Sequence, residues 1–170
     1  CETNLPVDHG DVDAACRGLV AALGEAGFLH HSGAGVGEKL DVRSLCLIRE
    51  TLARHDGLAD FAFAMQGLGM GAVSLFGTPD QRKWLDRTRK GQAISAFALT
   101  EPGAGSDAGA VSCKAKKVDG GYVLNGTKCF ITNAPICDKI TLFANTRESG
   151  GIRGLTVFTV DRNTPGVSIG

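Results

Sequence analysis

The amino-acid sequence predicts an α+β protein, with a helical amino-terminal domain over residues 1–92 and an antiparallel, barrel-like β-domain over residues 93–170. Apolar residues follow the 3.6-residue period of a helix up to about residue 92 and the two-residue period of a strand after it. Glycine makes up 24 of the 170 residues, about twice the usual share. Because the glycines are scattered between the periodic segments, they indicate many tight turns. Helices followed by strands in this way are typical of an α+β fold.

Three helices are predicted before residue 77. Apolar residues at helical spacing begin after Asp11, and Gly27 is placed to end that run. Asp41 is a second candidate cap, for a helix that stops near residues 55–57. Residues 58–76 are almost all apolar or glycine, so we expect a helix that is buried on most sides.

The fourth helix has the clearest signals. Thr78 is its predicted N-cap, Pro79 occupies the first helical position, and Gln81 completes a capping box. Gly91 is expected to end the helix.

Beyond residue 92 the pattern predicts strands. They cover residues 94–100, 111–118, 139–146 and 154–161, with turns at 119–121 and 164–166. A further hairpin is expected within residues 122–132, because Asn125-Gly126 is the dipeptide that favours a type I′ turn.

Composition argues against several classes of partner. Eighteen basic and eighteen acidic residues cancel, so we expect neither a nucleic acid nor a membrane surface as partner. No leader or membrane span is recognised, which predicts a cytoplasmic protein. The six cysteines form no C-x-x-C pair, and we interpret them as reduced, small core residues. No metal site is predicted, because the adjacent His30 and His31 have no other ligand at metal-binding spacing.

Two further patterns have simple structural explanations. Gly67–Ala72 reads G-x-G-x-x-A, the dinucleotide-binding pattern, but the strands and crossover that should surround it are missing. We therefore interpret these glycines as sites of close helix packing. The strand-region lysines are expected to form a solvated face. They are Lys114, Lys116, Lys117, Lys128 and Lys139.

Two segments of the β-region contain candidate binding residues. The loop "ALTEPGAGSDAGA" carries Thr100 and Ser106 among glycines that let the main chain approach a ligand closely. An ordinary hairpin loop is the alternative. In "CFITNA", Phe130 and Thr132 are two residues apart, so in an extended chain they project from one face. An aromatic ring beside a hydroxyl suits a planar cofactor.

Three stretches, in the same order, closely resemble the flavin-dependent acyl-CoA dehydrogenases. They are "FGTPDQRKWL" from Phe76, "FALTEPGAGSD" from Phe97 and "NGTKCFITNA" from Asn125. The resemblance is strong over residues 76–170, and residues 1–75 are compatible with the family's helical amino-terminal domain. It implies a central β-barrel domain and a carboxy-terminal helical bundle, absent from this chain, with FAD held between them.

The resemblance also implies roles for individual residues. Thr100 would bond the polar edge of the flavin, Thr132 would lie near its N5, and Ser106 would reach toward the pantetheine or phosphate of acyl-CoA. The full set of expected cofactor-binding residues is Phe97, Leu99, Thr100, Gly105, Ser106, Phe130, Ile131 and Thr132.

The implied reaction is the α,β-dehydrogenation of an acyl-CoA thioester in fatty acid metabolism. A carboxylate removes the α-proton while the β-hydrogen leaves as hydride to flavin. An electron-transfer flavoprotein is the expected electron acceptor, and a homo-oligomer is expected by analogy. In a eukaryote the location would be the mitochondrial matrix. An acyl-CoA oxidase and a non-catalytic binding or scaffold domain stay open as alternatives.

No residue of this chain is predicted to be the catalytic base, which the family carries in its carboxy-terminal bundle. We therefore expect the chain to be a fragment. Glu101 adjoins Thr100, but it precedes Pro102 and is expected to shape the turn. Phe130 stands where many relatives have tryptophan, and Ala134 where glycine is usual. A phenyl ring keeps a stacking face, so flavin contact should survive with altered geometry.

Overall fold

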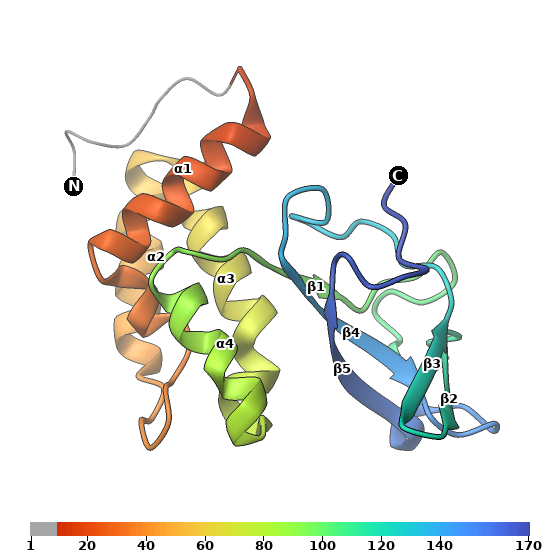
Figure 1. The fold of residues 1–170 in the computed structure, drawn as a ribbon. Helices are drawn as coiled ribbons and strands as arrows, with labels where there is room; N and C mark the ends of the chain where they lie inside the picture. The colour runs from red at the N-terminus through yellow and green to blue at the C-terminus, as the bar shows by residue number, and fades with distance from the viewer. Residues whose placement is uncertain (1–9) are drawn as a thin grey trace.

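The computed structural model describes residues 10–170 and places a helical layer beside a curved sheet (Figure 1). The helices are α1 (Val12–Glu25), η1 (Phe28–His31), α2 (Val42–His55), α3 (Gly57–Phe76), α4 (Pro79–Arg89), η2 (Ala108–Ala110) and η3 (Ile152–Gly154). The strands are β1 (Ser95–Ala98), β2 (Lys114–Val118), β3 (Gly121–Asn125), β4 (Lys139–Asn145) and β5 (Leu155–Asp161). The predicted order of helices followed by strands is confirmed.

Side-chain caps define where the long helices begin. The Asp11 carboxylate accepts the amide of Ala14 at α1, and Asp41 accepts the amide of Arg43 at α2. At α4 the predicted capping box is present in full, with Thr78 and Gln81 each bonding the other's backbone. These side chains satisfy amides that have no partner within the helix.

The central helix of the described region is α3, which packs against α1, α2, α4 and β1. One face is fully buried through Phe63 and Gln66, whereas Leu68 and Phe76 on the other side are exposed. The expectation of burial on most sides therefore holds for one face only. By length and composition alone, α3 is also the one helix in residues 10–170 that could cross a membrane, a test that the core helix of a soluble protein also passes.

The glycines of the G-x-G-x-x-A pattern lie inside α3, and close packing explains two of them. A Cβ on Gly69 would lie 2.5 Å from the Cβ of Ser95 on β1, and one on Gly67 would lie 2.9 Å from the carbonyl oxygen of Ser32. Neither position leaves space for a methyl group. These contacts support the interpretation that the pattern is a packing feature.

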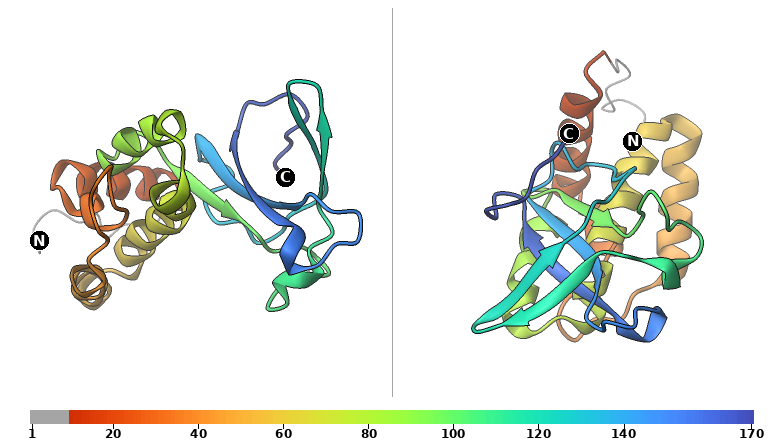
Figure 2. Two further views of the ribbon diagram at one scale, coloured as in Figure 1. Left: turned by 90° about the horizontal axis from the view of Figure 1, so that it is seen from below. Right: turned by 90° about the vertical axis from the view of Figure 1, so that its right-hand side faces the viewer.

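The sheet is mixed, with the order β1-β4-β2-β3, and β5 pairs with the whole length of β4 along its other edge. The β2–β3 and β4–β5 pairs are antiparallel, as expected, but β1 and β4 pair in parallel from Ser95↔Lys139 to Ala98↔Leu142. The 40 residues between these two strands are enough for the crossover that a parallel pair requires. The strands curve without closing into a barrel, and the carboxy-terminal segment returns across the open side (Figure 2).

The expected hairpin at Asn125-Gly126 is wrong. The strand β3 ends at Asn125, and residues 126–138 cross to β4 without forming a strand. The tight β2–β3 turn is instead Asp119-Gly120, where Gly120 adopts a φ of +80° that favours glycine. At Gly126, glycine is required for another reason, because a Cβ there would lie 2.7 Å from the Cβ of Cys113.

Three apolar clusters form the core of the described residues, and the smallest joins α3 to α4. The largest joins α1 and α3 to β1 and β4, and the second lies in the curve of the sheet around Val111 and Ala144. Three cysteines are buried and unpaired, as predicted, and burial raises the pKa of each thiol; they are Cys16, Cys113 and Cys137. Cys129 is half-buried, Cys46 is exposed, contrary to the expectation of a core position, and Cys1 lies outside the described residues.

Candidate functional site

The two candidate segments lie side by side. The Cys129 amide donates to the carbonyl oxygen of Thr100 at 3.0 Å, and Lys128 Nζ donates to that of Leu99, also at 3.0 Å. We call residues 99–106 the loop wall and residues 128–132 the turn wall. The first leaves the end of β1 and the second follows β3, so the sheet topology brings together residues nearly 30 positions apart.

Glu101 is buried at the base of the loop wall, and four donors converge on its carboxylate. They are the Ser112 amide at 2.7 Å, the Ser112 hydroxyl at 2.6 Å, the Cys113 amide at 3.0 Å and Lys128 Nζ at 2.8 Å. Burial raises the pKa of Glu101, but these bonds outweigh it and lower the pKa to about 2. Glu101 is therefore an ionised structural group, which agrees with the predicted role in shaping the turn.

Lys128 corrects a prediction. It was expected on a solvated face, yet its side chain is only 8% exposed and pairs with Glu101. Nothing in the sequence indicated this burial. The prediction treated Lys128 as part of an alternating strand, whereas the strand ends at Asn125.

The tip of the loop wall is open to solvent. A tight turn joins Glu101 and Ala104, whose backbones exchange hydrogen bonds of 2.9 and 3.1 Å. After it, Gly105 and Ser106 are exposed, and Asp107 caps the short helix η2 by accepting the Gly109 amide. Gly103 and Gly105 thus lie at the exposed tip of the loop.

The turn wall is not an extended strand, which corrects the second candidate segment. Phe130 has a φ of +56° and Asn133 a φ of +64°, and residues 132–136 fold into tight turns. Phe130 and Thr132 consequently do not share a strand face. The Phe130 side chain is 93% exposed. A left-handed backbone at a bulky residue is unfavourable, and such strain is concentrated at functional sites.

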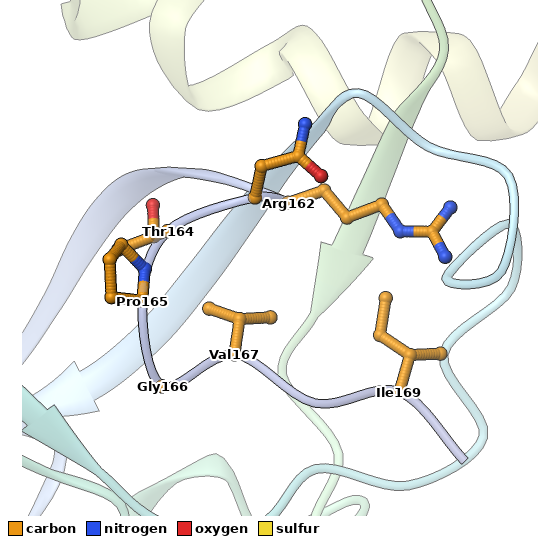
Figure 3. Close-up of a pocket in the computed structure, with 7 residues that line it drawn as sticks. Arg162, Thr164, Pro165, Gly166, Val167 and Ile169 are labelled. Carbon is orange, nitrogen blue, oxygen red and sulfur yellow. The ribbon is translucent and has the colours of Figure 1, made fainter.

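The helical layer contacts the turn that directly follows the turn wall. Asn133 is buried, and its Oδ1 lies 3.5 Å from Sγ of Cys16 on α1. The side-chain nitrogen Nδ2 of Asn133 is buried and has no hydrogen-bond partner in the described residues. Arg162, which follows β5, donates to the carbonyl oxygen of Pro135 and holds the far end of the same turn. Figure 3 shows its side chain extended toward this segment, across a cavity of about 360 Å³ lined by residues 162–167 and Ile169.

Several donors on the two walls are free. Across residues 10–170, the hydroxyls of Thr100, Ser106 and Thr132 make no hydrogen bond to protein. The same holds for the amides of Gly105, Ser106 and residues 130–132. Free donors beside an exposed aromatic ring are what a planar ligand with a polar edge requires.

The predicted residues are divided between the two faces of the sheet. Phe130 and Ile131 line a cavity of about 630 Å³ on the open side, with Ala98 and Leu142 among its other walls. Phe97 faces the opposite way, as alternation along β1 dictates. Its ring lies 5.0 Å from that of Phe143, and both line a second, apolar cavity of about 450 Å³ against α3. Neither Thr100, Ser106 nor Thr132 lines these cavities.

Comparisons with known proteins agree with this organisation. Residues 4–92 match the family model "Acyl-CoA dehydrogenase, N-terminal domain" and residues 96–170 match "Acyl-CoA dehydrogenase, middle domain". The 3-(aryl)acrylate reductase of Clostridium sporogenes is 41% identical over 89% of this chain and 41% of its own length. Subunit CarC of the caffeyl-CoA reductase-Etf complex of Acetobacterium woodii is 43% identical over 76% of this chain and 35% of its own.

A solved structure shows the same fold. The acyl-CoA dehydrogenase of Bacillus anthracis, complexed with FAD, superposes with a TM-score of 0.77 at 35% identity, over 94% of this chain and 28% of that one. The chain therefore spans less than half the length of these proteins.

Proposed function

The chain belongs to the acyl-CoA dehydrogenase family, and from this we propose that it forms part of an FAD-dependent oxidoreductase acting on acyl-CoA thioesters. The observation that carries the proposal is the juxtaposition of the two walls, each with free donors, beside the exposed Phe130 ring. The solved relative with bound FAD supports the same cofactor here.

The residues present fit a flavin in specific ways. The Thr100 and Thr132 hydroxyls would donate to the polar edge of the ring system, together with the free amides of Phe130 to Thr132. The Phe130 ring and the side chain of Ile131 would pack against its face. Gly105 and Ser106 would receive a polar part of the cofactor or of the thioester. Phe97 precedes the loop wall and Leu99 is its first residue, packed against the apolar cluster in the curve of the sheet; both would support the wall from the core side.

Bound FAD would supply the acceptor for the hydride that leaves the β-carbon. The described residues would bind and orient the cofactor and the thioester. None of them is assigned as the base that removes the α-proton. Glu101 is excluded from that role because its carboxylate is buried and accepts four hydrogen bonds, which lower its pKa to about 2 and make it a weak base. The apolar lining of the walls would help to exclude water from the reacting carbons.

We propose α,β-dehydrogenation as the direction of the reaction and an electron-transfer flavoprotein as the electron acceptor. The relative that is a subunit of a caffeyl-CoA reductase-Etf complex supports this partner. The names of two relatives favour a second candidate, the reduction of an α,β-unsaturated acid or thioester. Both candidates involve the same carbon–carbon bond.

Absorption spectroscopy on the full-length protein tests the proposal. We expect flavin bands in the visible region that bleach anaerobically when a saturated acyl-CoA is added. Bleaching followed by rapid oxygen consumption would identify an oxidase. Reoxidation of chemically reduced protein by an enoyl-CoA, without bleaching by saturated thioesters, would identify the reductase. Protein that binds no flavin would contradict the proposal.

A further inference from the structure

We propose that the buried Glu101–Lys128 ion pair is the positioning element of the flavin site, an inference that rests on the proposed function. Glu101 lines neither of the two cavities, and Lys128 borders the one of about 630 Å³ that Phe130 and Ile131 line. Their side chains are 2% and 8% exposed, and they lie between the loop wall and the turn wall. The pair acts on the cofactor through the backbone that it holds.

Lys128 fixes the register of the two walls. Its ammonium group bonds both the Glu101 carboxylate and the Leu99 carbonyl, while the next amide, that of Cys129, bonds the Thr100 carbonyl. The carbonyls of two successive residues on the loop wall thus turn toward the turn wall. This fixes the peptide planes on both sides of Thr100, whose hydroxyl and amide have no protein partner among residues 10–170.

Glu101 ties a third segment to the same point. Its bonds to Ser112 and Cys113 join the start of the loop wall to the residues that precede β2. The loop that carries Gly105 and Ser106 therefore begins and ends at one carboxylate. Its base is fixed while its tip remains accessible.

Stability alone does not require charges at these two positions. A buried ion pair is often no more stabilising than an apolar pair of similar size, although removal of one partner is strongly destabilising. What an apolar pair cannot provide is the bond from Lys128 to the Leu99 carbonyl. Replacing both charged residues by neutral ones should therefore affect flavin binding more than folding, if the role of the pair is to position the site.

The experiment uses full-length protein carrying Lys128→Met, Glu101→Gln or both. Gln at position 101 can still accept both bonds from Ser112 through its one oxygen, while its NH2 group replaces the oxygen that accepts from Cys113. Met at 128 fills the space of the lysine stem. Lys139→Met is the matched control, because it removes a lysine whose carboxylate partner, Asp161, is half-exposed at the end of β5. The readouts are the Kd for FAD, the visible circular dichroism of bound flavin, and the Tm of the apoprotein.

We expect Lys128→Met to weaken FAD binding about tenfold, as loss of a positioning bond of this kind implies. The double variant should have a higher apoprotein Tm than Lys128→Met, because the buried carboxylate is no longer left without its cation. Its FAD affinity and flavin dichroism should nevertheless stay altered. Lys139→Met should bind FAD within about twofold of wild type, since a partly exposed pair contributes little.

The outcomes separate the two proposals. A double variant that binds FAD as wild type does would overturn the positioning role and leave the proposed function intact. A double variant that fails to fold would also contradict it, because the charges would then be needed for the fold itself. Wild-type protein that binds no FAD would overturn the proposed function, and the positioning role with it.

Discussion

At the scale of single residues, the Glu101 carboxylate has the widest consequences. It is almost completely buried, and its donors come from two separate segments, residues 112–113 and Lys128. The interactions that hold it are made with the ionised form, so protonation would break the arrangement that organises both walls.

The stability of the protein should therefore depend on pH through Glu101. Its pKa is lowered from 4.5 to about 2 in the folded state, so the carboxylate stabilises the fold above pH 4.5 and this contribution is lost as the pH falls toward 2. A shift of this size corresponds to about 3 kcal/mol. In urea unfolding at pH 7, 4 and 3, Glu101→Gln should lose this part of the pH dependence. Parallel pH profiles for both proteins would show that Glu101 is not responsible.

Thr132 should contribute to cofactor binding and little to stability. Its hydroxyl bonds no protein group in residues 10–170, so Thr132→Val should leave the Tm nearly unchanged. Loss of one bond to flavin should weaken FAD binding by about 1 kcal/mol. Thr159→Val on β5, another half-buried threonine, is the control and should bind FAD normally. Equal affinities of the two variants for FAD would show that Thr132 does not contribute to flavin binding.

At the scale of elements, α3 and β1 are packed so closely that a single methyl group should matter. Gly69→Ala would place its Cβ against Ser95, both side chain and backbone, and should destabilise the protein by about 2 kcal/mol. The matched control is Gly71→Ala, two residues along the same helix, where nothing lies within 4 Å of the new Cβ. That variant should gain up to about 1 kcal/mol from helix propensity. Urea unfolding measures both, and equal effects would contradict the packing argument.

The elements that the sequence predicted well are those with local signals. The caps at Asp11, Asp41 and Thr78 lie directly before the helices they begin, so the first residues of these helices could be predicted from local sequence. The parallel partner of β1 could not be predicted, because alternation identifies a strand but not its neighbour. The Asn125-Gly126 prediction failed because the glycine there allows a close approach to Cys113, a tertiary contact that the dipeptide itself does not reveal.

The candidate site was predictable in part for the same reason. The two segments and their free donors were identified from residue types, and the structure brings the segments together. The conformation of Phe130 was not predictable, because nothing in the residue types of this segment indicates a positive φ at Phe130 or at Asn133. Lys128 could not be distinguished from the solvated lysines, because its burial depends on a carboxylate 27 residues away.

At the scale of the whole molecule, Gln66 joins the helical layer to the sheet. It is fully buried on α3; its amide donates to the Ala93 carbonyl and its oxygen accepts the amide and hydroxyl of Ser95. Gln66→Leu would leave these backbone groups unpaired and should cost about 3 kcal/mol. Gln92→Leu, at an exposed position nearby, should change stability by less than about 0.5 kcal/mol. Thermal unfolding compares them, and similar Tm values would show that Gln66 is dispensable.

The parallel pairing of β1 with β4 also determines the order in which this protein can assemble during synthesis. The β1 strand emerges from the ribosome directly after α4, yet its partner follows only after some 40 further residues. Until then the nascent chain has helices, but β1 has no strand partner. The closure of the long loop between β1 and β4 is slow. We therefore expect cofactor binding to be a late event in biogenesis, and a ribosome stalled before Lys139 should carry a chain that is helical but unable to retain flavin.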